Sequence, residues 1–424
     1  MTAASRATKE PRISKRAPAT PRAARRVRGY RRAAAATGLL LCCALAASCA
    51  SASTAPSSSG SPGSGSAAPQ SSGAGAGPQS PSASGPAGKL TAVQLAGQRV
   101  IYSFTGTTPP QSLLKLIREG EVAGVIFFSS NISSVSQLQS VTKELDAAQA
   151  ASPVHLPLLL MTDQEGGEVR RIAGGNPTQS QLSIGQSANP VKEAAVAGAG
   201  AAQTLSGAGL NVNLAPVLDV FAVPGNFIDS AQRSYSSDPA VVGAAGASFI
   251  TAQQQGGVAA TAKHFPGLGT ASKNENTDMV PVTLSEPLSQ IRAVDEQPYK
   301  QAIAAGVDLI MVSWAVYPAF DANRPAGLSS VVVQQELRGR LGYTGVTITD
   351  ALEAGALKSY GGPGQRAVDA ASAGMDLLLC SSGNVSQGEE ATQALASAMQ
   401  GGQLTSSSFN AAVARVDQLR TKLG

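Results

Sequence analysis

The sequence predicts an α/β fold of the (β/α)₈ barrel type, forming a single catalytic domain over residues 89–424. Three observations predict it: short apolar runs, Ala-rich or amphipathic helical stretches between them, and polar residues where the runs end. Apolar strands that alternate with helices indicate a parallel sheet covered on both faces. Eight repeats over about 335 residues fit a barrel. An open, doubly wound sheet is the alternative, but no G-x-G-x-x-G motif follows the first strand.

The expected strands are the apolar runs that are bounded by glycine, proline or polar residues. They are 98–104, 122–128, 156–161, 211–215, 258–262, 307–312, 346–349 and 375–380. The helical stretches between them include 135–150, 191–205, 240–255 and 288–305.

Residues 1–88 are expected to lie outside this domain. A basic head is followed by the uncharged apolar stretch 33–47, which describes a signal peptide over residues 1–48. Cys49 follows Ala-Ala-Ser and resembles the cysteine of a bacterial lipobox, although the usual Leu three places earlier is Ala46. We expect Cys49 to be lipidated, with an incidental thiol as the alternative. Residues 49–88 continue in Ser, Ala, Gly and Pro, which predicts a disordered tether.

The charge of the chain is concentrated at its start. Residues 1–32 hold eleven Lys or Arg and one acid, and the remaining residues carry 21 bases and 26 acids, a net charge of −5. The domain is therefore not expected to bind nucleic acid. Cys380 lies in an apolar run, so no disulfide framework or cysteine metal site is expected. The export signals predict an extracytoplasmic protein, anchored to the cell membrane through its lipid and secreted if Cys49 is not modified.

Polar side chains stand where four of the expected strands end. Asp163 follows the third strand, Arg233 lies in the loop after the fourth, Lys263 and His264 end the fifth, and Asp350 ends the seventh. In a barrel all these positions open onto one mouth, where barrel active sites lie. Taken singly, Asp350 could be a helix cap, Arg233 a surface charge and His264 a core histidine, but their convergence predicts one shared pocket.

A carboxylate backed by cationic side chains suits sugar chemistry. One carboxylate attacks the anomeric carbon while the other polar groups hold hydroxyls. A metal site fits less well, because the chain has two histidines and His155 precedes the third strand. Lys263 as a Schiff-base former is the alternative, but it leaves Asp163, Arg233 and His264 without a role.

Six motifs, in this order, resemble glycoside hydrolase family 3, specifically its single-domain β-N-acetylglucosaminidases of the bacterial lipoprotein type. They are AGVIFF at 123–128, DQEGG at 163–167, NLAPVLDV at 213–220, RSY at 233–235, KHFPG at 263–267 and TDAL at 349–352. The resemblance implies that Asp350 is the nucleophile of a retaining mechanism. It also implies that Asp163, Arg233, Lys263 and His264 bind the terminal sugar.

One departure from the family concerns the loop after KHFPG. The family's acetylglucosaminidases carry Asp-Ser-His in that loop, with the histidine as general acid/base, whereas residues 268–278 contain no histidine. A carboxylic acid with a raised pKa can protonate a leaving group, so Asp278, with Glu275 as the alternative, is expected to replace it. A plain surface turn in a slow enzyme is the competing interpretation.

The resulting expectation is an exo-acting, retaining β-N-acetylhexosaminidase that removes terminal N-acetylglucosamine from peptidoglycan fragments. It is expected to need no cofactor and to act as a monomer. Two alternatives stay open: a β-glucosidase-type glycosidase of the same family, and a sugar-binding lipoprotein without catalysis. The family's β-glucosidases usually carry a second α/β-sandwich domain, and a chain that ends at residue 424 is expected to lack one.

Overall fold

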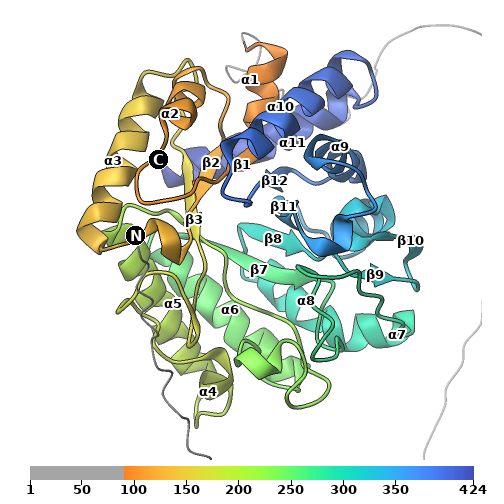
Figure 1. The fold of residues 1–424 in the computed structure, drawn as a ribbon. Coiled ribbons are helices and arrows are strands. Elements are labelled where there is room, and N and C mark those ends of the chain that lie inside the picture. The colour runs from red at the N-terminus through yellow and green to blue at the C-terminus, as the bar shows by residue number, and fades with distance from the viewer. Residues whose placement is uncertain (1–89) are drawn as a thin grey trace, which may run out of the picture. The chain divides into compact units, whose positions relative to one another are not determined.

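A computed structural model describes residues 90–424, which form a closed eight-stranded barrel of parallel strands surrounded by helices (Figure 1). Around the barrel the order is β1, β12, β11, β8, β7, β6, β3, β2, and β1 pairs with both β12 and β2 to close it. The strands are β1 Val100–Tyr102, β2 Gly124–Ile126, β3 Leu159–Thr162, β6 Val212–Asn213, β7 Ala259–Phe265, β8 Leu309–Val312, β11 Val346–Ala351 and β12 Leu377–Leu379. The predicted barrel is confirmed.

The fifth barrel strand differs from the expectation. Lys263 and His264 were expected to end it, but β7 continues through both to Phe265. It continues because neighbouring backbone pairs with it: Leu218 N–H donates to the Lys263 carbonyl at 2.7 Å, and Phe265 pairs with β8 at Val312. The carboxyl ends of the other seven strands lie within two residues of the expected ones. Polar side chains can therefore occupy a strand when its flanks are paired.

The helices begin at sequence signals that satisfy their free N–H groups. Ser134 caps α3, and Asn189 and Asp238 cap α5 and α6, each of the latter two followed by proline at the first helical position. The helices are α1 Ala92–Gly97, α2 Gln111–Arg118, α3 Val135–Ala150, α4 Gln181–Gly185, α5 Pro190–Gly207, α6 Pro239–Gln255, α7 Leu288–Gln290, α8 Gln297–Ala304, α9 Pro363–Ala373, α10 Val385–Gln400 and α11 Ser406–Leu423. Two π-helical segments, Ile291–Asp295 and Val331–Arg340, accompany them.

Alternation along the strands separates two apolar cores. Side chains such as Val100 and Leu160 pack outward against the helices, whereas Ile101 and Met161 belong to a second cluster formed by the opposite face of the strands. Val416 of α11 joins this inner cluster, so α11 contributes to the core of the barrel itself.

Two short hairpins extend the loops that follow barrel strands. β4 (Gln164–Gly166) pairs with β5 (Val169–Arg170) directly after β3, and β9 (Val316–Tyr317) pairs with β10 (Asp321–Pro325) after β8. Gly166 turns the first hairpin with φ of +112°, and a Cβ there would lie 2.2 Å from the carbonyl oxygen of Gln179. The turn therefore requires glycine and fixes the side chains just before it.

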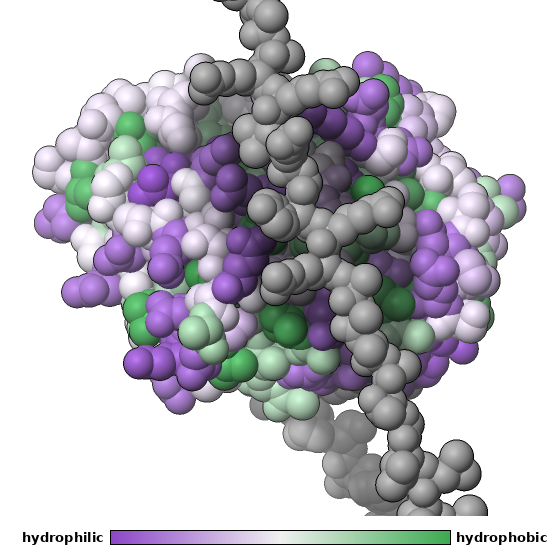
Figure 2. Space-filling model, turned by 90° about the horizontal axis from the view of Figure 1, so that it is seen from below, coloured by the Kyte–Doolittle hydropathy of each residue, from purple (hydrophilic) through white to green (hydrophobic). Residues whose placement is uncertain are grey.

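Apolar side chains are few on the surface. Figure 2 shows one face, on which hydrophilic residues are interspersed with pale ones and green ones occur in small groups. Among residues 90–424 the large apolar side chains that are exposed are Val135, Val191, Val196, Val223, Met279 and Val280. Within residues 90–424 no helix has both the length and the apolar character needed to cross a membrane. The expected signal peptide at 1–48, Cys49 and the tether at 49–88 lie outside the described residues.

Candidate active site

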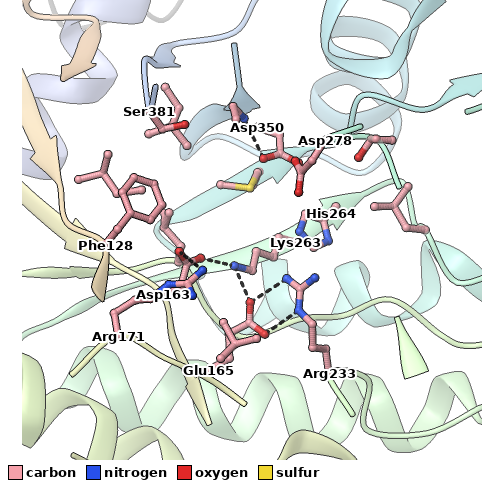
Figure 3. Close-up of a pocket in the computed structure, with 18 of the residues that line it drawn as sticks. Phe128, Asp163, Glu165, Arg171, Arg233, Lys263, His264, Asp278, Asp350 and Ser381 are labelled. Atoms are coloured by element: carbon pink, nitrogen blue, oxygen red, sulfur yellow. Dashed lines mark hydrogen bonds and ion pairs between the residues drawn. The ribbon is translucent and has the colours of Figure 1, made fainter. Parts of the chain in front are cut away.

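A cavity of about 440 Å³ opens where the barrel strands end, and it gathers all six side chains that the sequence predicted for the site (Figure 3). These side chains are Asp163, Arg233, Lys263, His264, Asp278 and Asp350. The wall is completed by Met311 of β8 and by side chains from further loops, among them Phe128, Phe227 and Ser381.

The ammonium of Lys263 is a buried charged group in the wall of the cavity. It is 2% exposed, and Nζ lies 2.8 Å from Oδ1 of Asp163 and 2.8 Å from Oε1 of Glu165. Burial alone would lower the pKa of Lys263, but the two carboxylates outweigh burial and raise it. Lys263 is thus held charged, which argues against the Schiff-base role, because that chemistry needs a neutral amine.

Glu165 is a buried carboxylate that the sequence did not single out for the site. Its two oxygens accept hydrogen bonds from Nε and Nη2 of Arg233 at 2.9 and 2.8 Å. Burial would raise the pKa of Glu165, but Arg233 and Lys263 lower it well below its usual range. Because Glu165 occupies two nitrogens of Arg233, Nη1 is the nitrogen that Arg233 can offer to a ligand. The signal for Glu165 was its place in the DQEGG motif, two residues after Asp163.

Asp163 has a second cationic neighbour, Arg171, which the sequence did not predict. Nη2 of Arg171 lies 3.6 Å from Oδ2 of Asp163, and its guanidinium carbon lies 5.9 Å from the centre of the Phe128 ring. Burial raises the pKa of Asp163, but Lys263 and Arg171 together lower it. Asp163 is therefore an ionised acceptor on the wall of the cavity.

His264 is oriented by Asp219, a fully buried acid that was also missed. Nδ1 of His264 lies 2.8 Å from Oδ2 of Asp219, and Oδ1 of Asp219 accepts the backbone N–H groups of His264 at 3.3 Å and Leu268 at 2.7 Å. Asp219 lies in the NLAPVLDV motif, where its apolar neighbours gave no sign of a partner 45 residues away.

Asp350 lies within β11, and its side chain lines the cavity. Its Oδ1 accepts the N–H of Ala351 at 2.8 Å, and the residue is half-buried. The alternative role as a helix cap is excluded, because α9 begins at Pro363 with Gly362 at its N-cap position.

Asp278 reaches the cavity from the loop after β7. The residue is exposed, but its carboxyl is partly enclosed by the cavity walls. This desolvation, together with the charge of Asp350, raises the pKa of Asp278 to about 6. Glu275 does not line the cavity; its carboxylate accepts the N–H of Ser272 at 2.6 Å within the loop. Of the two acids expected in this loop, only Asp278 lines the cavity.

The charged side chains of the cavity fall into two groups. Lys263 and Arg233 neutralise Asp163 and Glu165 and form a polar floor that can hold hydroxyl groups. Asp278 and Asp350 lie together on the other side of His264 (Figure 3). A carboxyl whose pKa is raised by a neighbouring carboxylate is the pattern of an acid/base pair. Within residues 90–424 no group of three or more His, Cys, Asp or Glu side chains is placed to hold a metal ion.

Residues 88–419 match the family described as the glycosyl hydrolase family 3 N terminal domain. The chain belongs to glycosyl hydrolase family 3. It is therefore a glycoside hydrolase, and its relatives include β-hexosaminidases. The enzyme is 48% identical over 330 residues to an uncharacterized secreted glycosyl hydrolase of Arthroderma benhamiae, covering 77% of this chain and 93% of that protein. It is 30% identical to β-hexosaminidase A of Pseudoalteromonas piscicida, covering 79% of this chain and 62% of that protein.

Solved structures of the family have the same fold. A β-N-acetylglucosaminidase from Paenibacillus sp. is 34% identical with a TM-score of 0.75, covering 79% of this chain and 63% of that one. A β-N-acetylhexosaminidase from Beutenbergia cavernae is 30% identical with a TM-score of 0.70, covering 78% of this chain and 99% of that one. This family 3 enzyme thus spans less than two thirds of the Pseudoalteromonas and Paenibacillus proteins and nearly the whole Beutenbergia chain.

Proposed function

We propose that this enzyme removes terminal β-linked N-acetylglucosamine with retention of configuration, using Asp350 as nucleophile and Asp278 as general acid/base. The observation that supports this best is the pair itself: Asp278 faces the cavity beside Asp350, and the pKa of Asp278 is raised to about 6 by desolvation and by the Asp350 carboxylate. A retaining glycosidase needs one ionised carboxylate and one protonated carboxyl on the two sides of the scissile bond.

The reaction proceeds in two steps. An Asp350 oxygen attacks the anomeric carbon, the bond from that carbon to the leaving oxygen breaks, and the Asp278 proton passes to the leaving oxygen. The Asp278 carboxylate then takes a proton from water, the hydroxide oxygen attacks the anomeric carbon, and the ester bond to Asp350 breaks. Each carboxyl ends in its starting protonation state.

The groups on the floor of the cavity are assigned to sugar binding. Asp163, Arg233, Lys263 and His264 all line it, and the first three are charged and held in place by one another or by Glu165. Side chains held in this way can bind hydroxyl and acetamido groups without losing much conformational freedom. Their number on one side of the cavity, with the catalytic pair on the other, favours an exo-acting enzyme that takes one terminal sugar.

The substrate assignment is tested by comparing nitrophenyl β-N-acetylglucosaminide with the matching β-glucoside. The names of the relatives from Pseudoalteromonas and Paenibacillus support the acetamido sugar. We expect kcat/KM to favour the N-acetylglucosaminide by at least about 100-fold, because a site built for the acetamido group loses binding when it is absent. Preference for the glucoside would establish a β-glucosidase instead, and binding of N-acetylglucosamine without turnover of either substrate would establish a sugar-binding protein.

Peptidoglycan fragments are the proposed natural substrate, and a lipid anchor at Cys49 would keep the enzyme outside the cytoplasmic membrane. The relative from Arthroderma benhamiae is described as secreted, which supports an extracytoplasmic enzyme. Cys49→Ser should abolish partition of the protein into detergent, whereas an unmodified N-terminus downstream of residue 50 in the wild type would exclude lipidation. Release of N-acetylglucosamine from a disaccharide with an N-acetylmuramic leaving sugar tests the substrate.

A further inference from the structure

Residues 268–284, called here the acid loop because they carry Asp278, are tied to the barrel at both ends. At the start, the N–H of Leu268 donates to Oδ1 of Asp219 at 2.7 Å. At the end, Val316 in β9 donates to the carbonyl of Val282 at 2.9 Å, and Leu284 donates back to the carbonyl of Val316 at 2.9 Å. The loop is thus anchored to the loop after β6 on one side and to the β9 hairpin on the other.

The middle of the acid loop docks on the chain that directly follows the nucleophile. The N–H of Gly355 donates to the carbonyl of Asp278 at 2.7 Å, and the N–H of Ala356 donates to the carbonyl of Thr277 at 3.0 Å. Gly355 comes five residues after Asp350 and four after Ala351, the last residue of β11. The two proposed catalytic carboxyls are therefore linked through a short stretch of backbone and two main-chain hydrogen bonds.

The contact at Gly355 leaves no room for a side chain. A Cβ on Gly355 would lie 2.1 Å from the carbonyl oxygen of Met279 and 2.3 Å from its carbonyl carbon. On the loop side, Oδ1 of Asn276 accepts the N–H of Asp278 at 2.9 Å, and the carbonyl of Asn276 accepts the N–H of Met279 at 3.0 Å. Asn276 fixes the backbone of Asp278 within the loop, and Gly355 fixes the loop against the barrel.

We propose that Gly355 and Asn276 are positioning residues that hold the carboxyl of Asp278 ready beside Asp350, so that the acid is in place before the substrate binds. The inference rests on the proposed role of Asp278. It differs from a mechanism in which a mobile loop delivers the acid on closing, because the contacts of this loop with Asp219, with Val316 and with Gly355 would have to break for it to open.

The proposal has a specific consequence for catalysis. Adding Cβ at Gly355 must push the acid loop away from β11, which moves Asp278 while the floor of the cavity keeps its ion pairs. A displacement of about 1 Å in a catalytic group can cost about 100-fold in rate. The loss should fall on kcat for substrates that need protonation of the leaving oxygen, while KM stays close to that of the wild type.

The test compares Gly355→Ala, Asn276→Ala and Asp278→Ala, with Gly207→Ala as the matched control. Gly207 ends α5, where a Cβ would meet nothing within 4 Å, and neither glycine has a positive φ, so the control removes one glycine without a clash. Each variant is assayed with N,N′-diacetylchitobiose, whose leaving group is a poor one, and with dinitrophenyl β-N-acetylglucosaminide, whose leaving group is activated. Thermal unfolding is recorded to show that each variant is folded.

We expect Gly355→Ala and Asn276→Ala to lose about tenfold to 100-fold in kcat on the disaccharide and much less on the aryl glycoside. The alkaline limb of the pH profile should move to lower pH in both variants. Desolvation, Asp350 and Glu353 raise the pKa of Asp278, whereas His264 and Arg233 lower it. Desolvation and the repulsion by Asp350 are the largest of these effects. Moving the carboxyl out toward water weakens both, so the pKa of Asp278 should fall. If the two residues had only a structural role, their replacement would lower kcat equally on both substrates and leave the pH profile unchanged.

The outcomes separate the two proposals. If Asp278→Ala is impaired on the disaccharide and rescued by azide, while folded Gly355→Ala and Asn276→Ala match the wild type, the positioning role is wrong and the acid assignment stands. If Asp278→Ala itself behaves as the wild type on the disaccharide, the acid assignment fails and the inference fails with it. Should Gly355→Ala not fold, Asn276→Ala decides alone, because its side chain lies in the partly exposed loop.

Discussion

Asp219 is bonded to His264 through Oδ2 and Nδ1 at 2.8 Å, beneath the floor of the cavity. The same carboxylate accepts the N–H of Leu268, where the acid loop begins. One buried acid therefore orients an imidazole that lines the cavity and fixes the start of the loop that carries Asp278. A carboxylate that accepts a hydrogen bond from Nδ1–H leaves Nε2 of a neutral histidine as an acceptor for a sugar hydroxyl.

Asp219→Asn is expected to weaken sugar binding more than it affects the chemical step. The amide can keep Oδ1 as acceptor for the two backbone N–H groups, but its NH₂ then faces Nδ1 and places the imidazole proton on Nε2. We expect KM for the aryl N-acetylglucosaminide to rise by about tenfold with a smaller change in kcat, since the lost interaction is shared by ground and transition states. A fall in kcat at constant KM would instead connect His264 with proton transfer.

Asp350→Asn should remove turnover while leaving the fold intact. The residue is half-buried, and its Oδ1 accepts the N–H of Ala351, a bond that the amide oxygen can keep. Without the nucleophile no glycosyl-enzyme ester forms, so kcat should fall by about 10³-fold or more. Mass spectrometry with a slow fluorinated glycoside should label the wild type and not the variant. Near-normal turnover by the variant would show that another group attacks the sugar.

Asp163→Ala tests the floor of the cavity. Lys263 would keep Glu165 as a partner at 2.8 Å, so the variant should fold, but a sugar acceptor and one counter-charge are gone. We expect KM to rise by about tenfold or more, with kcat reduced less, because a hydroxyl-binding group contributes to both states. Unchanged KM in kinetics with the aryl glycoside would exclude Asp163 from substrate binding.

The barrel and the gathering of five of the six side chains into one cavity could be predicted because strand ends are visible in a linear pattern, whereas Asp278 was expected from the resemblance of the loop after KHFPG to that of the family. Apolar runs alternate with helical stretches, and in parallel strands the polar residue after each run comes to the same edge. The extension of β7 through Lys263 and His264 could not be predicted, because it depends on pairing with residues 216–218, which are far away in the sequence.

The two buried acids that hold the site residues in place could not be predicted for a related reason. Glu165 and Asp219 act through partners 68 and 45 residues away, and the motifs in which they lie do not indicate which side chain each carboxylate binds. The acid loop contacts Gly355 through main-chain atoms. Such a contact can form with almost any side chains, so the glycine is its only mark in the sequence. Sequence patterns report which strand end a residue belongs to, whereas ion pairs and backbone contacts depend on how the ends meet.

The pH profile of the wild type should report Asp278. Desolvation and the charge of Asp350 raise the pKa of Asp278 to about 6, and a general acid is active only while protonated. We therefore expect kcat/KM on N,N′-diacetylchitobiose to fall as pH rises above about 6, and Asp278→Ala to lose this limb. For the dinitrophenyl glycoside the limb should be weak in both proteins, because that leaving group needs no proton. A limb that persists in Asp278→Ala would belong to another group.

Asp295 should make the enzyme less stable as pH rises. It packs against Gly267 below the acid loop, is 4% exposed, and its Oδ1 has no hydrogen-bond partner in the described part of the chain. Burial, then the charges of Asp219 and Glu286, raise its pKa to about 8. Between about pH 4 and pH 8 the unfolded chain ionises this carboxyl while the folded protein keeps it protonated, so the free energy of unfolding falls across that window.

Asp295→Asn removes this titration while preserving the shape of the protonated acid. The difference in free energy of unfolding between the variant and the wild type should therefore grow with pH from about 4 to about 8, by an amount on the order of a few kcal/mol. Urea unfolding at several pH values measures it, with Glu144→Gln on the exposed face of α3 as the control that removes a charge from solvent. If the curves of Asp295→Asn and the wild type run parallel across this range, Asp295 is ionised in the folded enzyme and its neighbours must stabilise the charge.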